Sequence, residues 1–108
     1  MIPAYMKRKA NAKILVSGAT GYIGSYTCKI MAAIHPDCTI YALSRSDPDT
    51  NRDKHPGMAA FPNIQFVQGD CLKGDSLPVD VMRECDSVVH LVGSITDQIN
   101  YKPILKWA

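Results

Sequence analysis

A run of strand-forming residues, Ile14-Leu-Val-Ser17, leads directly into three glycines spaced Gly-x-x-Gly-x-x-Gly, at Gly18, Gly21 and Gly24. An apolar pattern with helical spacing follows the last glycine. A strand, a glycine-rich turn and a helix in this order let the backbone approach a pyrophosphate and present helix N-terminal amides to it. Three glycines alone fit an ordinary glycine-rich turn equally well. The strand–turn–helix context favours a dinucleotide-binding turn.

Each glycine has a separate expected role in this turn. Gly18 ends the strand where a tight turn leaves no room for a Cβ. Gly21 lies where the loop passes beneath the phosphates, and Gly24 lets the helix pack close to the strand. The hydroxyls of Thr20 and Ser25 are candidate additional donors. The spacing differs from the older Gly-x-Gly-x-x-Gly fingerprint of dinucleotide-binding proteins.

The size and charge of the chain limit what it can be. At 108 residues it is one domain, and its 46% hydrophobic and 20% charged residues are typical of a globular protein. The net charge of +2 is too small to indicate nucleic-acid binding. No run approaches the ~18 apolar residues that a membrane span needs, so none is expected.

The four cysteines, at positions 28, 38, 71 and 85, form neither a Cys-x-x-Cys pair nor a zinc-binding spacing. We expect them to be reduced, as small core or near-surface residues in a non-oxidising compartment, in preference to a disulfide framework.

Residues 1–12 form a basic tail, and no acidic residue occurs before Asp37. Basic, acid-poor leaders are typical of mitochondrial transit peptides, although this one is short and Pro3 weakens any helix in it. A solvated tail ahead of the first strand is the slightly favoured alternative. The localisation predicted for the chain is mitochondrial, with the cytoplasm as the alternative.

The hydrophobic pattern predicts alternating strands and helices. Strands are expected at 13–17, 39–43, 64–68 and 87–92, helices at 22–34 and 75–85, a loop with at most a short helical turn at 45–62, and a weakly helical tail at 95–108. On the first helix, the apolar positions fall on one face at helical spacing: Ile23, Thr27, Ile30, Met31 and Ile34.

This order predicts an α/β fold with right-handed crossovers, in which residues 13–94 form half of a doubly wound, Rossmann-type parallel sheet. The expected strand order is 3-2-1-4. The point where the strand order reverses then lies between the first and fourth strands, beside the glycine turn, and ligands bind at that point in such sheets.

The end of the second strand predicts which dinucleotide binds. NAD sites usually carry an acidic residue there, about 20 residues past the glycines, which binds the ribose hydroxyls. This chain has Ser44, Arg45 and Ser46 instead. Because an arginine can pair with a 2′-phosphate and stack on adenine, we expect NADP(H) in preference to NAD(H). The alternative is that Arg45 is a solvated loop charge.

Two further polar residues are of interest: Asp70 follows the third strand, and His90 lies in the fourth. Asp70 is either an acceptor for the adenine amino group or a turn residue. His90, alone in an apolar strand, is expected to be a packed core residue rather than a catalyst. No nucleophile–base pair, carboxylate pair or metal cluster is recognisable, so neither a catalytic residue nor a metal site is predicted.

Taken together, these segments resemble the short-chain dehydrogenase/reductase superfamily in its extended and atypical branches. The matching segments are Ser17-Gly-Ala-Thr-Gly-Tyr-Ile-Gly24, Leu43-Ser-Arg-Ser46, Gly69-Asp70 and Cys85-Asp-Ser-Val-Val-His-Leu-Val-Gly93. The resemblance implies pyrophosphate contacts at Gly18, Thr20, Gly21, Tyr22, Ile23 and Gly24. It implies adenosine ribose contacts at Ser44, Arg45 and Ser46, adenine contacts at Asp70 and Cys71, and contacts to the middle of the cofactor at Leu91, Val92 and Gly93.

Residues 89–102 look most like the mitochondrial atypical members, which include the nucleotide-binding accessory subunit of respiratory complex I and a relative linked to coenzyme Q synthesis. In that accessory subunit the cofactor is regarded as structural. The superfamily's catalytic Tyr-x-x-x-Lys has no counterpart here, because Tyr101 is followed by lysines at offsets one and five.

Two functions are therefore expected. The first is an NADP(H)-binding structural or accessory subunit, in a mitochondrial assembly and without turnover by itself. The second is the cofactor-binding half of an NADP(H)-dependent oxidoreductase or epimerase whose catalytic part lies elsewhere. In either case, a protein partner or a missing C-terminal half should complete the sheet, because the fourth strand would otherwise be an exposed edge.

Overall fold

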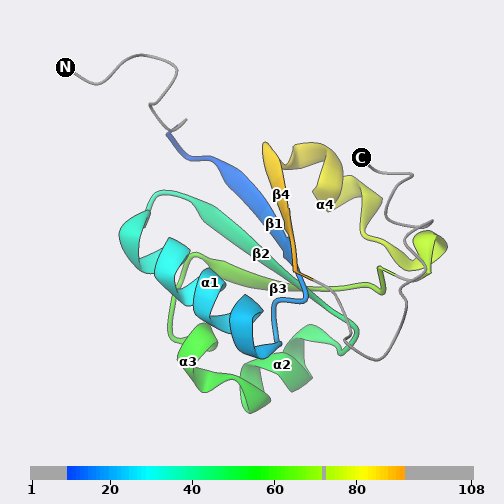
Figure 1. The fold of residues 1–108 in the computed structure, drawn as a ribbon, viewed down its shortest axis with the longest axis horizontal. Coiled ribbons are helices and arrows are strands. Elements are labelled where there is room, and N and C mark those ends of the chain that lie inside the picture. Colours follow the sequence, from blue (N-terminus) through cyan, green and yellow to red (C-terminus); the bar gives the residue numbers. More distant parts are fainter. Residues whose placement is uncertain (1–9, 72, 92–108) are drawn as a thin grey trace.

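The computed structural model of the protein describes residues 10–71 and 73–91. Its centre is a parallel sheet of four strands in the order β3-β2-β1-β4, which confirms the predicted fold class and strand order (Figure 1). The strands are β1 (Lys13–Ser17), β2 (Thr39–Ser44), β3 (Ile64–Gln68) and β4 (Ser87–His90). Since all neighbours pair in parallel, the carboxyl ends of the strands share one edge of the sheet.

Helices cover both faces of this sheet. The helical elements are α1 (Tyr22–Ile34), α2 (Pro48–Lys54), α3 (Pro56–Ala59), the 3₁₀ turn η2 (Gly74–Ser76) and α4 (Val79–Glu84). Figure 1 shows α1, α2 and α3 together on one face and α4 on the other. This arrangement follows from the right-handed crossovers, because the chain moves one way across the sheet from β1 to β3 and back to reach β4.

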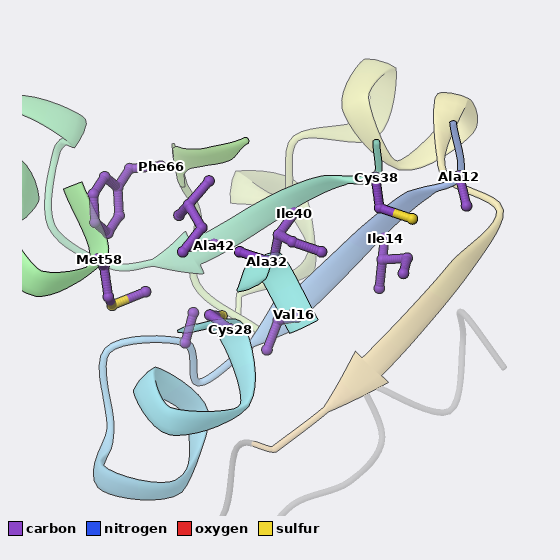
Figure 2. Close-up of a cluster of buried hydrophobic side chains, with 12 residues drawn as sticks. Ala12, Ile14, Val16, Cys28, Ala32, Cys38, Ile40, Ala42, Met58 and Phe66 are labelled. Carbon is purple, nitrogen blue, oxygen red and sulfur yellow. The ribbon is translucent and has the colours of Figure 1, made fainter. Parts of the chain in front are cut away.

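The core lies in two layers, one on each face. Alternate strand residues such as Ile14, Val16 and Ile40 contact Cys28 and Ala32 of α1 and Met58 of α3 (Figure 2). The intervening residues Leu15, Tyr41 and Leu43 contact Leu77 and the side chains of α4. The residues of β1 and β2 are therefore apolar on both faces, as the unbroken hydrophobic runs in the sequence predicted.

The face that α1 presents to the sheet only partly matches the apolar face seen in the sequence, of which Met31 packs against the core. Gly24, Cys28 and Ala32 are its buried residues. Ile23, Ile30 and Ile34 are 66%, 53% and 64% exposed. The physical reason is that small side chains let the helix axis lie close to the sheet, so the bulky residues are turned outward.

The boundaries of several helices and strands also differ from those predicted from the sequence. The predicted loop 45–62 contains α2 and α3, because Asp47 caps the first of them and Pro48 and Pro56 each occupy the first position of a helix. The predicted helix 75–85 is instead the turn η2 followed by α4, with Pro78 at the start of α4. The assigned strand β4 ends at His90. The tail predictions for residues 1–9 and 95–108 lie outside the described residues.

Within 10–71 and 73–91, no helix is long and apolar enough to cross a bilayer. Among the described residues, no disulfide joins the four cysteines; Cys28 and Cys38 are buried, and Cys71 and Cys85 are half-buried. Burial raises the pKa of the Cys28 thiol to about 12.

Candidate dinucleotide site at the carboxyl edge of the sheet

The structure brings the predicted site residues of all four strands to one edge. The turn Gly18–Gly24 follows β1, Ser44 ends β2, Asp70 follows β3 and Leu91 follows β4. Backbone hydrogen bonds join these ends: the Ala19 N–H donates to the Leu43 carbonyl at 3.4 Å, and the Gly69 N–H donates to the Ser44 carbonyl at 2.9 Å. The predicted residues Val92 and Gly93 lie outside the described part of the chain.

The glycine turn has the close backbone packing that the sequence suggested. Gly18 has φ 65°, a left-handed conformation that favours glycine. A Cβ on Gly24 would lie 1.9 Å from the Gly18 carbonyl oxygen, so only glycine lets α1 approach the turn this closely. A Cβ on Gly21 would lie 3.3 Å from the same oxygen. Where Gly21 and Gly24 approach Gly18, the turn is therefore formed by backbone atoms alone.

The N-terminus of α1 offers unoccupied donors for an anion. Its cap residue, Gly21, has no side chain that could bond to the first-turn N–H groups, and no acidic residue occupies the first turn. The first N–H groups of a helix have no intrahelical partner, and the helix dipole makes this end favourable for negative charge. Tyr22 and Ile23 are exposed here. The arrangement suits a phosphate group.

The end of β2 is held in place by a hydrogen bond within the predicted site and by two residues outside it, Gln68 and Asn51. The Ser46 N–H donates to Ser44 Oγ at 3.2 Å. The side-chain amide of Gln68, on β3, donates to the Arg45 carbonyl at 3.1 Å. Asn51 of α2 is buried and donates from Nδ2 to the Ser46 carbonyl at 3.2 Å. These bonds fix the backbone at Arg45.

The Arg45 side chain is exposed. Within the part of the chain that the structure describes, its guanidinium makes no ion pair. A cation at the end of β2 therefore stands next to the glycine turn with its charge available to a ligand. Arginine presents several donors in a planar fork that matches a phosphate group.

The loop after β3 is organised by Ser76, a residue the sequence did not single out. Its hydroxyl accepts from the Asp70 N–H at 3.0 Å and donates to the Lys73 carbonyl at 2.8 Å. Cys71 follows, half-buried. Burial and, to a lesser degree, the Asp70 carboxylate raise the pKa of the Cys71 thiol, while a hydrogen bond with Ser17 opposes this shift.

His90 is not the packed core residue that the sequence predicted. Its side chain is exposed at the end of β4, and its Nδ1 lies 2.5 Å from Oγ of the buried Ser17 on β1. The Leu91 N–H donates to the same Oγ at 3.1 Å. Partial desolvation lowers the pKa of His90. The pairing was not foreseeable locally, because Ser17 and His90 are far apart in the sequence.

The described side chains contain no group of three His, Cys, Asp or Glu residues placed to hold a metal ion. The edge provides backbone amides, hydroxyls and the exposed Arg45, together with Asp70, Cys71 and His90. The amides, the hydroxyls and Arg45 are groups suited to an anionic ligand, and none of the described groups forms a recognisable proton-transfer pair with a lysine.

Residues 14–104 match the model of the NAD dependent epimerase/dehydratase family. The chain belongs to this family, which lies in the extended short-chain dehydrogenase/reductase superfamily and binds NAD or NADP. The resemblance inferred from the sequence is confirmed at this level.

Individual relatives cover the same region. The chain is 34% identical over 100 residues to a phenylcoumaran benzylic ether reductase of Ginkgo biloba, covering 88% of this chain and 31% of the reductase. It is 30% identical over 78 residues to a trifunctional UDP-glucose 4,6-dehydratase, epimerase and reductase of Arabidopsis thaliana, covering 71% of this chain and 12% of that protein.

Among solved structures, the terminal R domain of the myxalamid biosynthetic pathway superposes with a TM-score of 0.69 at 22% identity, over 89% of this chain and 28% of that one. This likeness supports the fold. The chain spans less than a third of the length of the curated relatives described here.

Proposed function

We propose that this chain is an NADP(H)-binding module. In this proposal, the uncapped N-terminus of α1 and the glycine turn hold the pyrophosphate, and Arg45 holds the 2′-phosphate. Asp70 and Cys71 lie against adenine, and the segment from Leu91 through Gly93 follows the middle of the cofactor. The observation that carries the proposal is the junction of Gly24 with Gly18, because it brings a free helix N-terminus to the edge where Arg45 lies.

We further propose that the module acts as a structural or accessory subunit in a mitochondrial assembly and does not turn over substrate by itself. Support comes from the described site, which offers binding groups without a tyrosine–lysine pair. The likeness of residues 89–102 to mitochondrial atypical members, the complex I accessory subunit among them, points the same way.

A second candidate is the cofactor-binding half of an NADP(H)-dependent oxidoreductase or epimerase. It is favoured by the Ginkgo relative, which is a reductase, and by the Arabidopsis relative, which includes dehydratase, epimerase and reductase activities. Hydride exchange with a ketone substrate, or a Tyr-x-x-x-Lys in a longer form of the chain, would favour this candidate over the accessory subunit.

The cofactor preference is tested by calorimetric titration of the chain with NADPH and with NADH. Arg45→Ala should weaken NADPH binding roughly ten- to a hundredfold, since hydrogen bonds to charged groups contribute about 1.5–3 kcal/mol. NADH binding should change little. Arg83→Ala, which removes an exposed arginine from α4, controls for the loss of one positive charge. Equal weakening of both nucleotides by Arg45→Ala would contradict the preference.

A further inference from the structure

His90 is a titratable side chain at the place where β1 and β4 meet beside the glycine turn. It pairs in register with Ser17, the residue directly before Gly18. Neighbouring strands lie about 4.8 Å apart and consecutive Cα atoms about 3.8 Å apart, so the Cα atoms of His90 and Gly18 are at most about 9 Å apart. This separation is close to the Debye length at physiological salt, so a charge at His90 is only partly screened from a ligand on the turn.

One nitrogen of the His90 ring is held in place and the other is free. Nδ1 lies 2.5 Å from Oγ of Ser17, a residue that is 1% exposed. Nε2 has no hydrogen-bond partner among the described residues, and the side chain of His90 is exposed. Ser17 therefore fixes the ring at Nδ1 and leaves Nε2 available to a ligand.

The hydroxyl of Ser17 can accommodate a protonated ring without losing a hydrogen bond. Both nitrogens of a protonated histidine are donors, whereas a hydroxyl oxygen accepts two hydrogen bonds and donates one. Ser17 Oγ accepts from the Leu91 N–H at 3.1 Å and donates to the Val89 carbonyl at 3.5 Å. One acceptor position is left for His90. Protonation of His90 thus adds a charge beside the turn while the contacts between β1 and β4 remain.

The charged side chains of the described residues leave the His90 ring unperturbed. Strand β1 faces the ring with Ser17, the other residues of β4 are uncharged, and the turn Gly18–Gly24 has no charged residue. Cys71 also contacts Ser17, and because the pKa of its thiol is raised, that thiol is neutral. Partial desolvation lowers the pKa of His90, with no contribution from Asp70 in the loop after β3 or from the charged residues of α4. A proton on His90 is therefore not neutralised by a neighbouring carboxylate.

We propose that His90 is a further binding group for the pyrophosphate and acts in its protonated form. This role depends on the proposed function, since it needs a dinucleotide on the glycine turn. The turn and α1 offer backbone amides and a helix dipole, but no full positive charge. Protonated His90 adds that charge and a free Nε2–H, and hydrogen bonds between charged groups are stronger than those between neutral ones. Dinucleotide affinity therefore rises as His90 becomes protonated.

The first test is calorimetric titration with NADPH between pH 8 and pH 5.5. His90→Gln is compared with the wild type and with His35→Gln, which removes a histidine at the far end of α1, about 20 Å from the turn by helix length. The 2′-phosphate of NADPH titrates near pH 6 in every sample, so the affinities are compared as ratios. For charges about 9 Å apart, the ratio of wild-type to His90→Gln affinity should rise roughly three- to tenfold over this range. The ratio of wild type to His35→Gln should stay constant.

The second test does not need a variant that folds. An NMR pH titration of the ring protons follows all three histidines, His35, His55 and His90, in the free chain and with saturating NADPH. We expect NADPH to raise the pKa of His90 and to leave the pKa values of the other two unchanged.

The outcomes separate this role from the proposed function. If NADPH binds at pH 8 but leaves the pKa of His90 unchanged or lowers it, His90 is not a binding group and the dinucleotide site still stands. An identical pH response of the wild type and His90→Gln would overturn the role in the same way. No binding of NADPH at any pH would overturn both.

Discussion

Ser17 Oγ on β1 lies 2.5 Å from His90 Nδ1 on β4 and joins the two strands between which the candidate site opens. The same oxygen accepts from the Leu91 N–H at 3.1 Å. The Ser17 hydroxyl also donates to the Val89 carbonyl at 3.5 Å, and the donor and acceptor roles in its contact with His90 are set by the tautomer of the His90 ring. Ser17 thus links the side chain of His90 to the backbone that leads out of β4.

The first prediction concerns pH. Because the pKa of His90 is lowered in the folded state, the unfolded chain binds the proton more readily. The free energy of unfolding should therefore decrease as pH falls below about 6.5, the usual value for histidine, and level off below the folded-state pKa. His90→Gln should remove this part of the pH dependence, as measured by urea unfolding between pH 8 and 5. A wild-type curve identical to that of the variant would contradict the lowered pKa of His90 in the folded state.

The second prediction concerns the glycine turn. Gly24→Ala places a Cβ 1.9 Å from the Gly18 carbonyl oxygen. Although alanine favours helices, the clash with backbone should lower the free energy of unfolding by about 3 kcal/mol or more. Gly74→Ala is the control, since a Cβ there meets nothing within 4 Å. Equal urea midpoints for the two variants would refute the close packing.

The third prediction uses two cysteines as reporters. Cys71 and Cys85 are both half-buried, and burial is the main cause of the raised pKa of each thiol. If adenine lies against Cys71, NADPH should slow the alkylation of Cys71 by iodoacetamide several-fold and leave Cys85 unchanged. Peptide mass spectrometry measures both rates in one sample. Equal protection of the two thiols would place the nucleotide elsewhere.

The fourth prediction concerns the support of the Arg45 loop. Asn51→Asp keeps the shape of a buried side chain but removes the donor to the Ser46 carbonyl. We expect the free energy of unfolding to fall by about 1–3 kcal/mol or more, because a buried acceptor loses its partner and a carboxylate replaces the neutral amide beside it. NADPH affinity should fall as well, since the loop loosens. Asp53→Asn, at an exposed position of α2, should change neither quantity.

The strands and the glycine turn could be predicted because their signals are local. Continuous apolar runs such as Ile14–Val16 indicate strands that are buried on both faces. Gly18 and Gly24 indicate tight backbone packing between residues that are only a few positions apart in the sequence. The order of the parallel strands then follows from the right-handedness of the crossover connections, so it can be predicted without knowing any side-chain contact.

The orientation of α1 could not be predicted in the same way. Helical periodicity identifies an apolar face, but it does not say which partner covers that face. Cys28 and Ala32 contact the sheet because they are small, while Ile30 and Ile34 remain exposed. Part of the apolar face seen in the sequence is therefore exposed among the described residues.

The supports of the site were also missed, for a different reason. Gln68 reaches the Arg45 carbonyl across 23 positions of sequence, and Ser17 reaches His90 across 73. Polar residues such as these carry no periodic signal, and only the strand order brings them together. The candidate ligand-binding groups could be identified from the sequence, but the side chains that hold these groups in place could not.

The central claim, that a dinucleotide lies on the glycine turn, is tested most directly by an NMR titration of the chain with NADPH. We expect the amide resonances of residues 20–24, Arg45, Asp70 and Leu91 to shift together and saturate, while those of α3 stay in place. Shifts confined to other surfaces, or none at millimolar NADPH, would contradict the account.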